Sequence, residues 1–401
     1  MQTKVYATRP MCLLHFAAGA FKHNPEEMQE GLSSYASDLI KRAFADIDPS
    51  RLVDYHTHVA GLGTGDTGIF INPRLTSWTH PLSYLRFKVY LSAANVTDLE
   101  HADTQVVDRL VRLVTNIEHH GKYRLLAFDK HYRRDGTVNL EKTEFYVPND
   151  YVFSLATKFP DLFEPVISVH PYRTDALSEL EQGAKLGARM VKWLPNAMGI
   201  DPSDELCTRF YLKMKELDLV LLTHGGEEKA VEAENDQKLG NPLLLRLPLD
   251  LGVKVIVAHC AGLGENEDIE DLNRRRRGNF DLFLRLMSER RYEGLLFADI
   301  SAMTQFNRSG VPLRTILERD DLHERLVNGS DYPLPAINIL VRTSSLVKQG
   351  YITSEERIGL NQIYDYNPLL FDFTLKRTIK HPATSRRLPA ALFMTNNALG
   401  A

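Results

Sequence analysis

Short apolar runs alternate with stretches of helical spacing along most of the chain. Eight runs rich in β-branched or other apolar residues predict strands: Leu52–His58, Tyr123–Phe128, Glu164–Val169, Arg189–Leu194, Leu219–His224, Val253–His259, Leu295–Ile300 and Leu326–Asp331. The stretches between the later runs predict helices: Ala176–Leu186, Asp204–Leu217, Asn241–Leu251, Phe280–Arg291 and Val311–Glu318. Strands that alternate with helices are typical of a parallel sheet. Eight such units favour an α/β fold closed into a (β/α)8 TIM barrel over an open sheet.

Three regions fall outside this repeat. Residues 61–121 are too long for one loop and one helix, so we expect a helical cap over the barrel mouth, with Thr104–His119 as its longest helix. Residues 1–50 should form an N-terminal arm and a helix that starts at Asn24-Pro25, ends near Ala45 and packs on the barrel. The barrel would then span residues 51–380, and residues 381–401 would form a C-terminal tail that serves as an arm or an oligomer contact.

Composition excludes some classes of protein. The chain has 401 residues, 43% of them hydrophobic and 25% charged, which is ample for a large core. A net charge of −4 disfavours a nucleic-acid partner. The apolar run Met11–Phe21 is short and contains His15, so we expect a packed arm there and neither a secretory signal nor a membrane span. Three scattered cysteines fit a reducing, cytoplasmic location.

Side chains of metal-binding or catalytic type recur where the predicted strands end. His56 and His58 are two residues apart on one strand, so both imidazoles point to the same face. Imidazole is a common metal ligand. The same pattern follows on four further strands, at Lys192, His224, His259 and Asp331. The carboxyl ends of the strands form the catalytic face of a parallel barrel, so we expect these six side chains to meet there.

These motifs resemble those of the amidohydrolase superfamily. The shared pattern is His-x-His on strand one, lysine on strand four, histidine on strands five and six, and aspartate on strand eight. The segments DYHTHV, THGG, AHCAG and NGSDYP look most similar to the amidohydrolase-2 branch, which is related to aminocarboxymuconate-semialdehyde decarboxylase. The motifs span residues 54–333, which cover the barrel but neither the cap nor the tail.

The resemblance implies a role for each residue. His56, His58, His224 and Asp331 match the ligands of a single divalent metal, usually zinc, and this ligand set suits zinc chemically. Water bound to such a metal has a pKa near about 7 and becomes a nucleophile. Asp331 can accept its proton, while His259 matches the catalytic histidine that polarises the substrate or stabilises negative charge.

Lys192 allows two interpretations. In binuclear members of the superfamily a lysine on this strand is carboxylated and bridges two metals, with the strand-six histidine as a further ligand. In the branch that the motifs resemble most, one metal is usual, so we expect one metal and an uncarboxylated Lys192. A simpler alternative is that Lys192 hydrogen-bonds a substrate carboxylate or a neighbouring acid.

Other candidate residues carry less weight. Gly63–Gly68 fits the spacing G-x-G-x-x-G, but an extended, proline-broken segment follows it and not a helix, so we expect a flexible loop and no nucleotide cofactor. His170, Arg173, Trp193 and Arg308 follow or end strands at the expected mouth, and an arginine there suits a carboxylate.

Together these features predict a metal-dependent hydrolase. Activated water would attack an amide, ester or lactone-type carbon of a small molecule, which could carry a carboxylate. The first alternative is a metal-dependent decarboxylase of a small carboxylic acid. The second is a barrel that binds a small acid without turnover. No nucleic acid or membrane partner is expected, and the sequence leaves a homo-oligomer open.

Overall fold

The eight predicted strands form a closed parallel barrel, which confirms the predicted fold. The computed structural model describes residues 23–231 and 233–400. Two ladders run in the orders β1-β3-β5 and β6-β7-β8-β11-β12. Parallel bridges from Ile167 to Val191 and from Thr57 to Tyr332 join the ladders at both edges. The barrel strands are β1 Val53–His58, β3 Lys122–Leu126, β5 Phe163–Val166, β6 Met190–Trp193, β7 Val220–His224, β8 Val255–Ala258, β11 Leu296–Asp299 and β12 Leu326–Val327.

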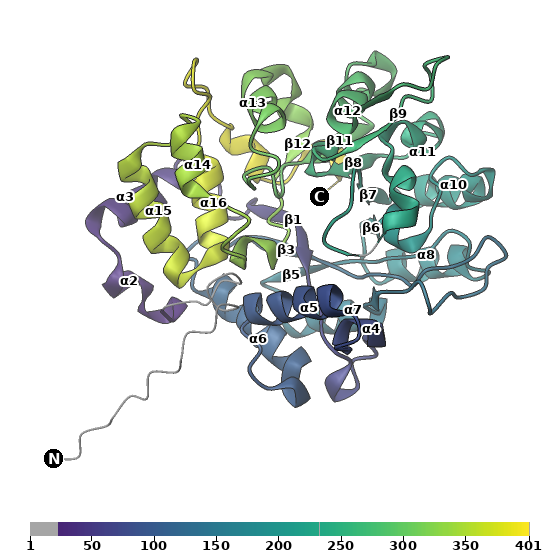
Figure 1. Cartoon of the computed structure of the whole chain (residues 1–401), viewed down its shortest axis with the longest axis horizontal. Helices are drawn as coiled ribbons and strands as arrows, with labels where there is room; N and C mark the ends of the chain where they lie inside the picture. The colour runs from purple at the N-terminus through teal and green to yellow at the C-terminus, as the bar shows by residue number, and fades with distance from the viewer. Residues whose placement is uncertain (1–22, 232, 401) are drawn as a thin grey trace.

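Helices lie around the ring of strands (Figure 1). They are α2 Met28–Gly31, α3 Ser34–Ala43, α4 Pro73–Thr76, α5 Pro81–Ala93, α6 Ala102–Thr115, α7 Asn149–Lys158, α8 Ala176–Lys185, α9 Pro195–Met198, α10 Thr208–Glu216, α11 Arg246–Asp250, α12 Asn279–Met287, α13 Val311–Glu318, α14 Thr343–Lys348, α15 Ser354–Tyr366 and α16 Pro368–Thr378. Two small antiparallel pairs lie outside the barrel: β2 Phe70–Ile71 with β4 Phe145–Tyr146, and β9 Glu265–Glu267 with β10 Arg276–Gly278. Within the described residues, no helix combines the length and the apolar character that crossing a membrane requires.

Apolar side chains fill the inside of the barrel in layers. This interior cluster is Val53, Tyr55, Leu126, Val166, Met190, Val220, Leu222, Ile256, Ala258, Phe297, Val327 and Leu399. Alternate residues of the same strands, such as Val191 and Leu221, pack outward against the helices in a second and larger cluster. A strand that is apolar on both faces is expected of a parallel sheet covered by helices.

The insertion after β1 divides between two locations. Helix α6 lies on the outer layer, because Asn367 Nδ2, just before α16, donates to Leu113 O at 2.7 Å and Arg112 pairs with Glu26 at 2.7 Å. Helix α5 instead reaches the loop that follows β7, where Tyr90 Oη donates to Ala230 O at 3.1 Å. Within residues 61–121, the position of α5 is therefore the support for the expected cap. The segment predicted as the longest helix of the cap is α6, which belongs to the barrel wall.

The predicted N-terminal helix is broken into η1 Pro25–Glu27, α2 and α3. Ser33 interrupts it, because the Ser33 hydroxyl accepts a hydrogen bond from Ala36 N and so starts α3 afresh. The expectations for the segment Met11–Phe21 and for Cys12 lie outside the described residues.

The C-terminal tail packs on its own barrel. Leu388, Leu392 and Phe393 are buried, and Leu399 belongs to the barrel interior cluster. Asn396 N donates to Tyr55 Oη at 3.0 Å. The tail therefore covers the end of the barrel where the strands begin, and its apolar side chains explain why it does not extend away as an arm.

Candidate metal centre

A bulge in β1 turns two histidines into the barrel. Asp54 pairs with Tyr123 and Thr57 pairs with Leu125, so one extra residue lies between these pairs on β1. Strict alternation from Val53 and Tyr55, which face the interior, would place Thr57 inward. The bulge shifts this alternation by one residue, as β-bulges do. His56 and His58 consequently point into the barrel, at the end where the strands finish.

Three potential ligand atoms converge there. His56 Nε2 lies 3.2 Å from His58 Nε2 and 3.4 Å from Asp331 Oδ1, and His58 Nε2 lies 3.3 Å from the same oxygen. His56 and Asp331 are buried, whereas His58 is partly exposed at the mouth. Asp331 adopts a left-handed φ of 59°, which aims its carboxylate at the two rings. This trio forms a cluster with the spacing of a metal site.

Asp299 sets the orientation of His56. Its Oδ2 lies 2.8 Å from His56 Nδ1, so Nδ1 carries the proton and Nε2 presents a lone pair to the cluster. Burial and the charge of Lys192 lower the pKa of His56 to about 4, so the ring is neutral at pH 7. Burial would raise the pKa of Asp331, but His259, His56 and the hydrogen bond from His58 lower it below its usual value. The cluster thus offers a neutral His56 imidazole and an ionised Asp331 carboxylate, the protonation states in which these groups bind a metal.

His224 adds an unused nitrogen beside this cluster. Its ring centroid lies 5.4 Å from that of His259, and Glu228 Oε2 lies 3.4 Å from His224 Nδ1. Its Nε2 is buried and has no hydrogen-bond partner among the described residues. A buried polar atom without a partner is unfavourable unless something binds it. His56, His58 and Asp331 therefore fit a divalent cation by spacing and by donor type, whereas His224 lies outside this trio.

A second group with metal-site spacing, His56, His259 and Asp299, has another explanation. Asp299 Oδ1 already accepts hydrogen bonds from His259 N at 2.9 Å, from Ser301 N at 3.0 Å and from the Ser301 hydroxyl. Its Oδ2 is used by His56. Both carboxylate oxygens therefore accept hydrogen bonds from neighbouring residues, which orients the His56 ring and the His259 backbone.

His259 faces Asp331 across the same space. The Ser301 hydroxyl donates to Asp299, so Ser301 Oγ accepts from His259 Nδ1 at 2.7 Å, which leaves a lone pair on Nε2. That Nε2 lies 3.7 Å from Asp331 Oδ2. Two hydrogen-bond acceptors that face each other favour a bound cation or a proton donor between them. Burial holds the pKa of His259 well below its usual value, so its ring is neutral.

Lys192 joins the cluster from β6. It is 2% exposed, and its Nζ lies 3.2 Å from His56 Nε2. Burial lowers the pKa of the ammonium, although the charges of Asp299 and Asp331 oppose this. The barrel therefore brings all six predicted residues together at one end.

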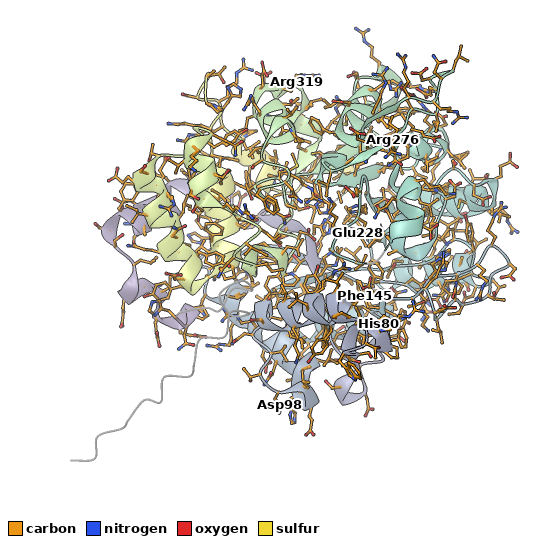
Figure 2. The ribbon with its side chains drawn as sticks, in the orientation of Figure 1. His80, Asp98, Phe145, Glu228, Arg276 and Arg319 are labelled. Atoms are coloured by element: carbon orange, nitrogen blue, oxygen red, sulfur yellow. The ribbon has the colours of Figure 1, made fainter. Side chains whose placement is uncertain are left out.

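Two residues of the site were not predicted, and a third was given little weight. Asp299 ends β11 in the same way that Asp331 follows β12, so the same strand-end signal could have found it. Glu228 lies in the loop after β7, where the sequence carries no such signal. Figure 2 shows it near the centre of the view, whereas Arg319 lies at the upper edge. Arg308 is 6% exposed, and its Nε lacks a hydrogen-bond partner in the described part of the chain. The charges of Asp331 and Glu228 act on it.

The other weak candidates lie elsewhere. His170 Nε2 lies 3.0 Å from Met198 O, and Arg173 pairs with Asp129 at 3.1 Å. The glycine loop is held by Asp103, whose carboxylate accepts from Gly63 N at 3.1 Å and from Leu62 N and Thr67 Oγ1, both at 2.5 Å. Strand β2 follows the loop, as the extended sequence predicted, so the loop does not open a nucleotide-binding helix.

Comparisons with solved structures give distant matches. An uncharacterised TIM-barrel protein from Bordetella bronchiseptica matches at a TM-score of 0.48 and 15% identity, over 78% of this chain and 94% of the other. A putative 2-pyrone-4,6-dicarboxylic acid hydrolase from Pseudomonas putida matches at 0.42 and 17%, over 81% and 98%. A 5-carboxyvanillate decarboxylase from Novosphingobium aromaticivorans with bound manganese matches at 0.43 and 14%, over 80% and 94%. A search of curated proteins found no match.

The sequence model described as amidohydrolase matches residues 125–337, more than half of the chain. This range includes Lys192, His224, His259 and Asp331, and it starts after the His56 and His58 pair. The chain belongs to the amidohydrolase family of enzymes.

Proposed function

We propose that this enzyme is a metal-dependent hydrolase of small molecules, with one divalent cation, zinc in the first instance, held by His56, His58, His224 and Asp331. The observation that carries the proposal is the approach of His56 Nε2, His58 Nε2 and Asp331 Oδ1 to within 3.4 Å of one another. Imidazole nitrogens and a carboxylate oxygen at this spacing are stable when a cation lies between them. A cation bound there supplies an activated water of lowered pKa.

The chain's own residues then handle protons and charge. Asp331 Oδ2, which faces His259, accepts the proton of the attacking water. His259 Nε2 lies on the other side of the same space and contacts the substrate group that becomes negative. Lys192, uncarboxylated, balances the charge of Asp331 and Asp299 from the β6 side.

Arg308 is proposed to hold a carboxylate of the substrate. Its guanidinium is buried and under the influence of Asp331 and Glu228, and Nη1 donates to Gln305 Oε1 at 3.2 Å. A buried guanidinium with an unused donor is well suited to bind a carboxylate. The enzyme would therefore act on small acids that carry an amide, ester or lactone.

A decarboxylase is the second candidate, and the same Arg308 favours it. A carboxylate held between Arg308 and the metal ligands could be the group that leaves as carbon dioxide. A barrel that binds a small acid without turnover remains the third candidate. We also propose a cytoplasmic location; Cys207 and Cys260 are buried free thiols, which suits a reducing compartment.

One experiment separates these candidates. The protein is loaded with zinc or with manganese and is incubated with lactones, esters, amides and aromatic acids, and both ring or bond opening and carbon dioxide release are recorded. Hydrolysis that disappears in the His56→Ala/His58→Ala variant supports the proposal. Carbon dioxide release without hydrolysis favours the decarboxylase. Full metal loading with acid binding but no turnover would contradict both enzymatic candidates.

A further inference from the structure

A buried ion pair lies behind the proposed metal site. Lys376 on α16 is 0% exposed, and its Nζ lies 2.5 Å from Asp372 Oδ2. The same Nζ donates to Gly329 O at 2.6 Å. A buried ammonium is unfavourable unless it is paired and hydrogen-bonded, so this geometry is closely determined. Lys376 thus links the C-terminal helix to the segment that carries Asp331.

The segment Gly329–Asp331 has little freedom of its own. A Cβ on Gly329 would lie 2.6 Å from His56 Cβ, so the backbone is pressed against β1. Asp331 N donates to His56 O at 2.7 Å, and Asp331 has a left-handed φ of 59°. Any shift of Gly329 would therefore displace Asp331 relative to His56.

Asp54 ties the same segment to β1. Its carboxylate accepts from Ser330 N at 3.0 and 3.1 Å and from His56 N at 2.9 Å. The charge of Lys376 acts on this carboxylate as well. One buried network, Asp372–Lys376–Gly329 with Asp54, therefore supports the backbone of two proposed metal ligands.

We propose that Lys376 is a positioning residue of the metal site: it fixes the Gly329 carbonyl and thereby the distance between Asp331 and His56. The inference rests on the metal site proposed above. Mutation of a group that orients a metal ligand from outside the ligand shell commonly lowers metal affinity by about 10- to 100-fold. Lys376 would act in this way through the backbone and not through a ligand side chain.

Three variants test this. Lys376→Met removes the donor to Gly329 O, Asp372→Asn keeps that donor, and Arg124→Met removes another buried cation at the opposite end of the barrel. For each variant, the zinc dissociation constant is measured by competition with a chromophoric chelator, and Tm is measured without metal. We expect zinc affinity to fall about 10- to 100-fold in Lys376→Met and to stay within about threefold of wild type in the other two, given the usual scatter of such effects. All three should lower Tm.

The outcomes are distinct. Lys376→Met protein with lowered Tm but wild-type zinc affinity would show that the pair is only structural and would overturn the inference. If Lys376→Met does not fold, Lys376→Met/Asp372→Leu removes both charges and should fold, because no charge stays unpaired; wild-type affinity in this double variant would also overturn it. Wild-type protein that binds no metal would overturn the metal site itself, which is a different failure.

Discussion

Lys192 Nζ lies 3.2 Å from His56 Nε2, with both groups buried. That nitrogen of His56 presents its lone pair to the cluster, because Asp299 accepts the proton of Nδ1. The lone pair can be directed at the lysine or at a cation, but not fully at both. A cation can therefore bind His56 only when Lys192 no longer donates a hydrogen bond to Nε2. Lys192 would have to move towards a carboxylate or become carboxylated.

The state of Lys192 sets the metal count. We expect one cation per chain and no carbamate, because the sequence motifs resemble those of mononuclear enzymes. Metal analysis of the purified protein measures the number of cations per chain. ¹³C NMR after growth with labelled bicarbonate detects a carbamate on Lys192. A carbamate signal together with two metals per chain would reverse this prediction and favour binuclear hydrolysis.

Removal of His56 and His58 should abolish metal binding. His56→Ala/His58→Ala deletes two ligand nitrogens, while the β1 backbone is still held by its ladder to β3. Ligand binding stabilises the folded state by about 2.7 kcal/mol at a concentration 100 times Kd. Added zinc should therefore raise the Tm of wild type and leave that of the variant unchanged, as measured by thermal unfolding with and without EDTA. An equal shift in both proteins would exclude these two ligands.

His259 should affect turnover more than metal content. His259→Asn preserves a donor near Ser301 but removes the lone pair that faces Asp331. We expect about one metal per chain, with kcat reduced by about 10²- to 10⁴-fold, the range for loss of a general acid or base. A lowered metal count would assign His259 as a ligand of a second cation. Full activity with unchanged metal would contradict both roles.

Asp299 should control metal affinity although it binds no metal itself. In Asp299→Asn the charge that fixes the His56 tautomer is lost, so Nε2 can take the proton and cease to be a ligand. We expect zinc affinity to fall about 10- to 100-fold, as for other residues that orient metal ligands. Asp38→Asn, at an exposed residue of α3, serves as the control. The comparison uses the same chelator competition; equal affinities in the two variants would count against this role.

Arg308 should determine preference for acids. Once a substrate is known, Arg308→Met should raise KM for the carboxylate-bearing compound by about 10- to 200-fold, the scale of one lost charged hydrogen bond of about 1.5–3 kcal/mol. The neutral ester of the same compound should be affected much less. Arg319→Met, at the periphery (Figure 2), is the matched control. An equal rise in KM for both compounds would indicate a structural role for Arg308.

The periodicity of the chain predicted the eight barrel strands, and residue spacing predicted that His56 and His58 share a face. It could not predict which face, because that depends on the bulge between Asp54 and Thr57, where β1 pairs with a strand nearly 70 residues away. Helix α6 was assigned to the cap because its amphipathic pattern is the same whether it covers a mouth or a wall; the contact between Leu113 and Asn367 decides the matter. The part played by Glu228 could not be predicted, because a loop carries no periodic pattern of apolar residues.

The contact between Asn396 and Tyr55 has a consequence for how the protein is made. Tyr55 is in the first barrel strand, and its partner Asn396 lies 341 residues later in the chain. During synthesis the end of the barrel beneath Tyr55 therefore stays uncovered until Asn396 has been made, so this long-range contact forms late.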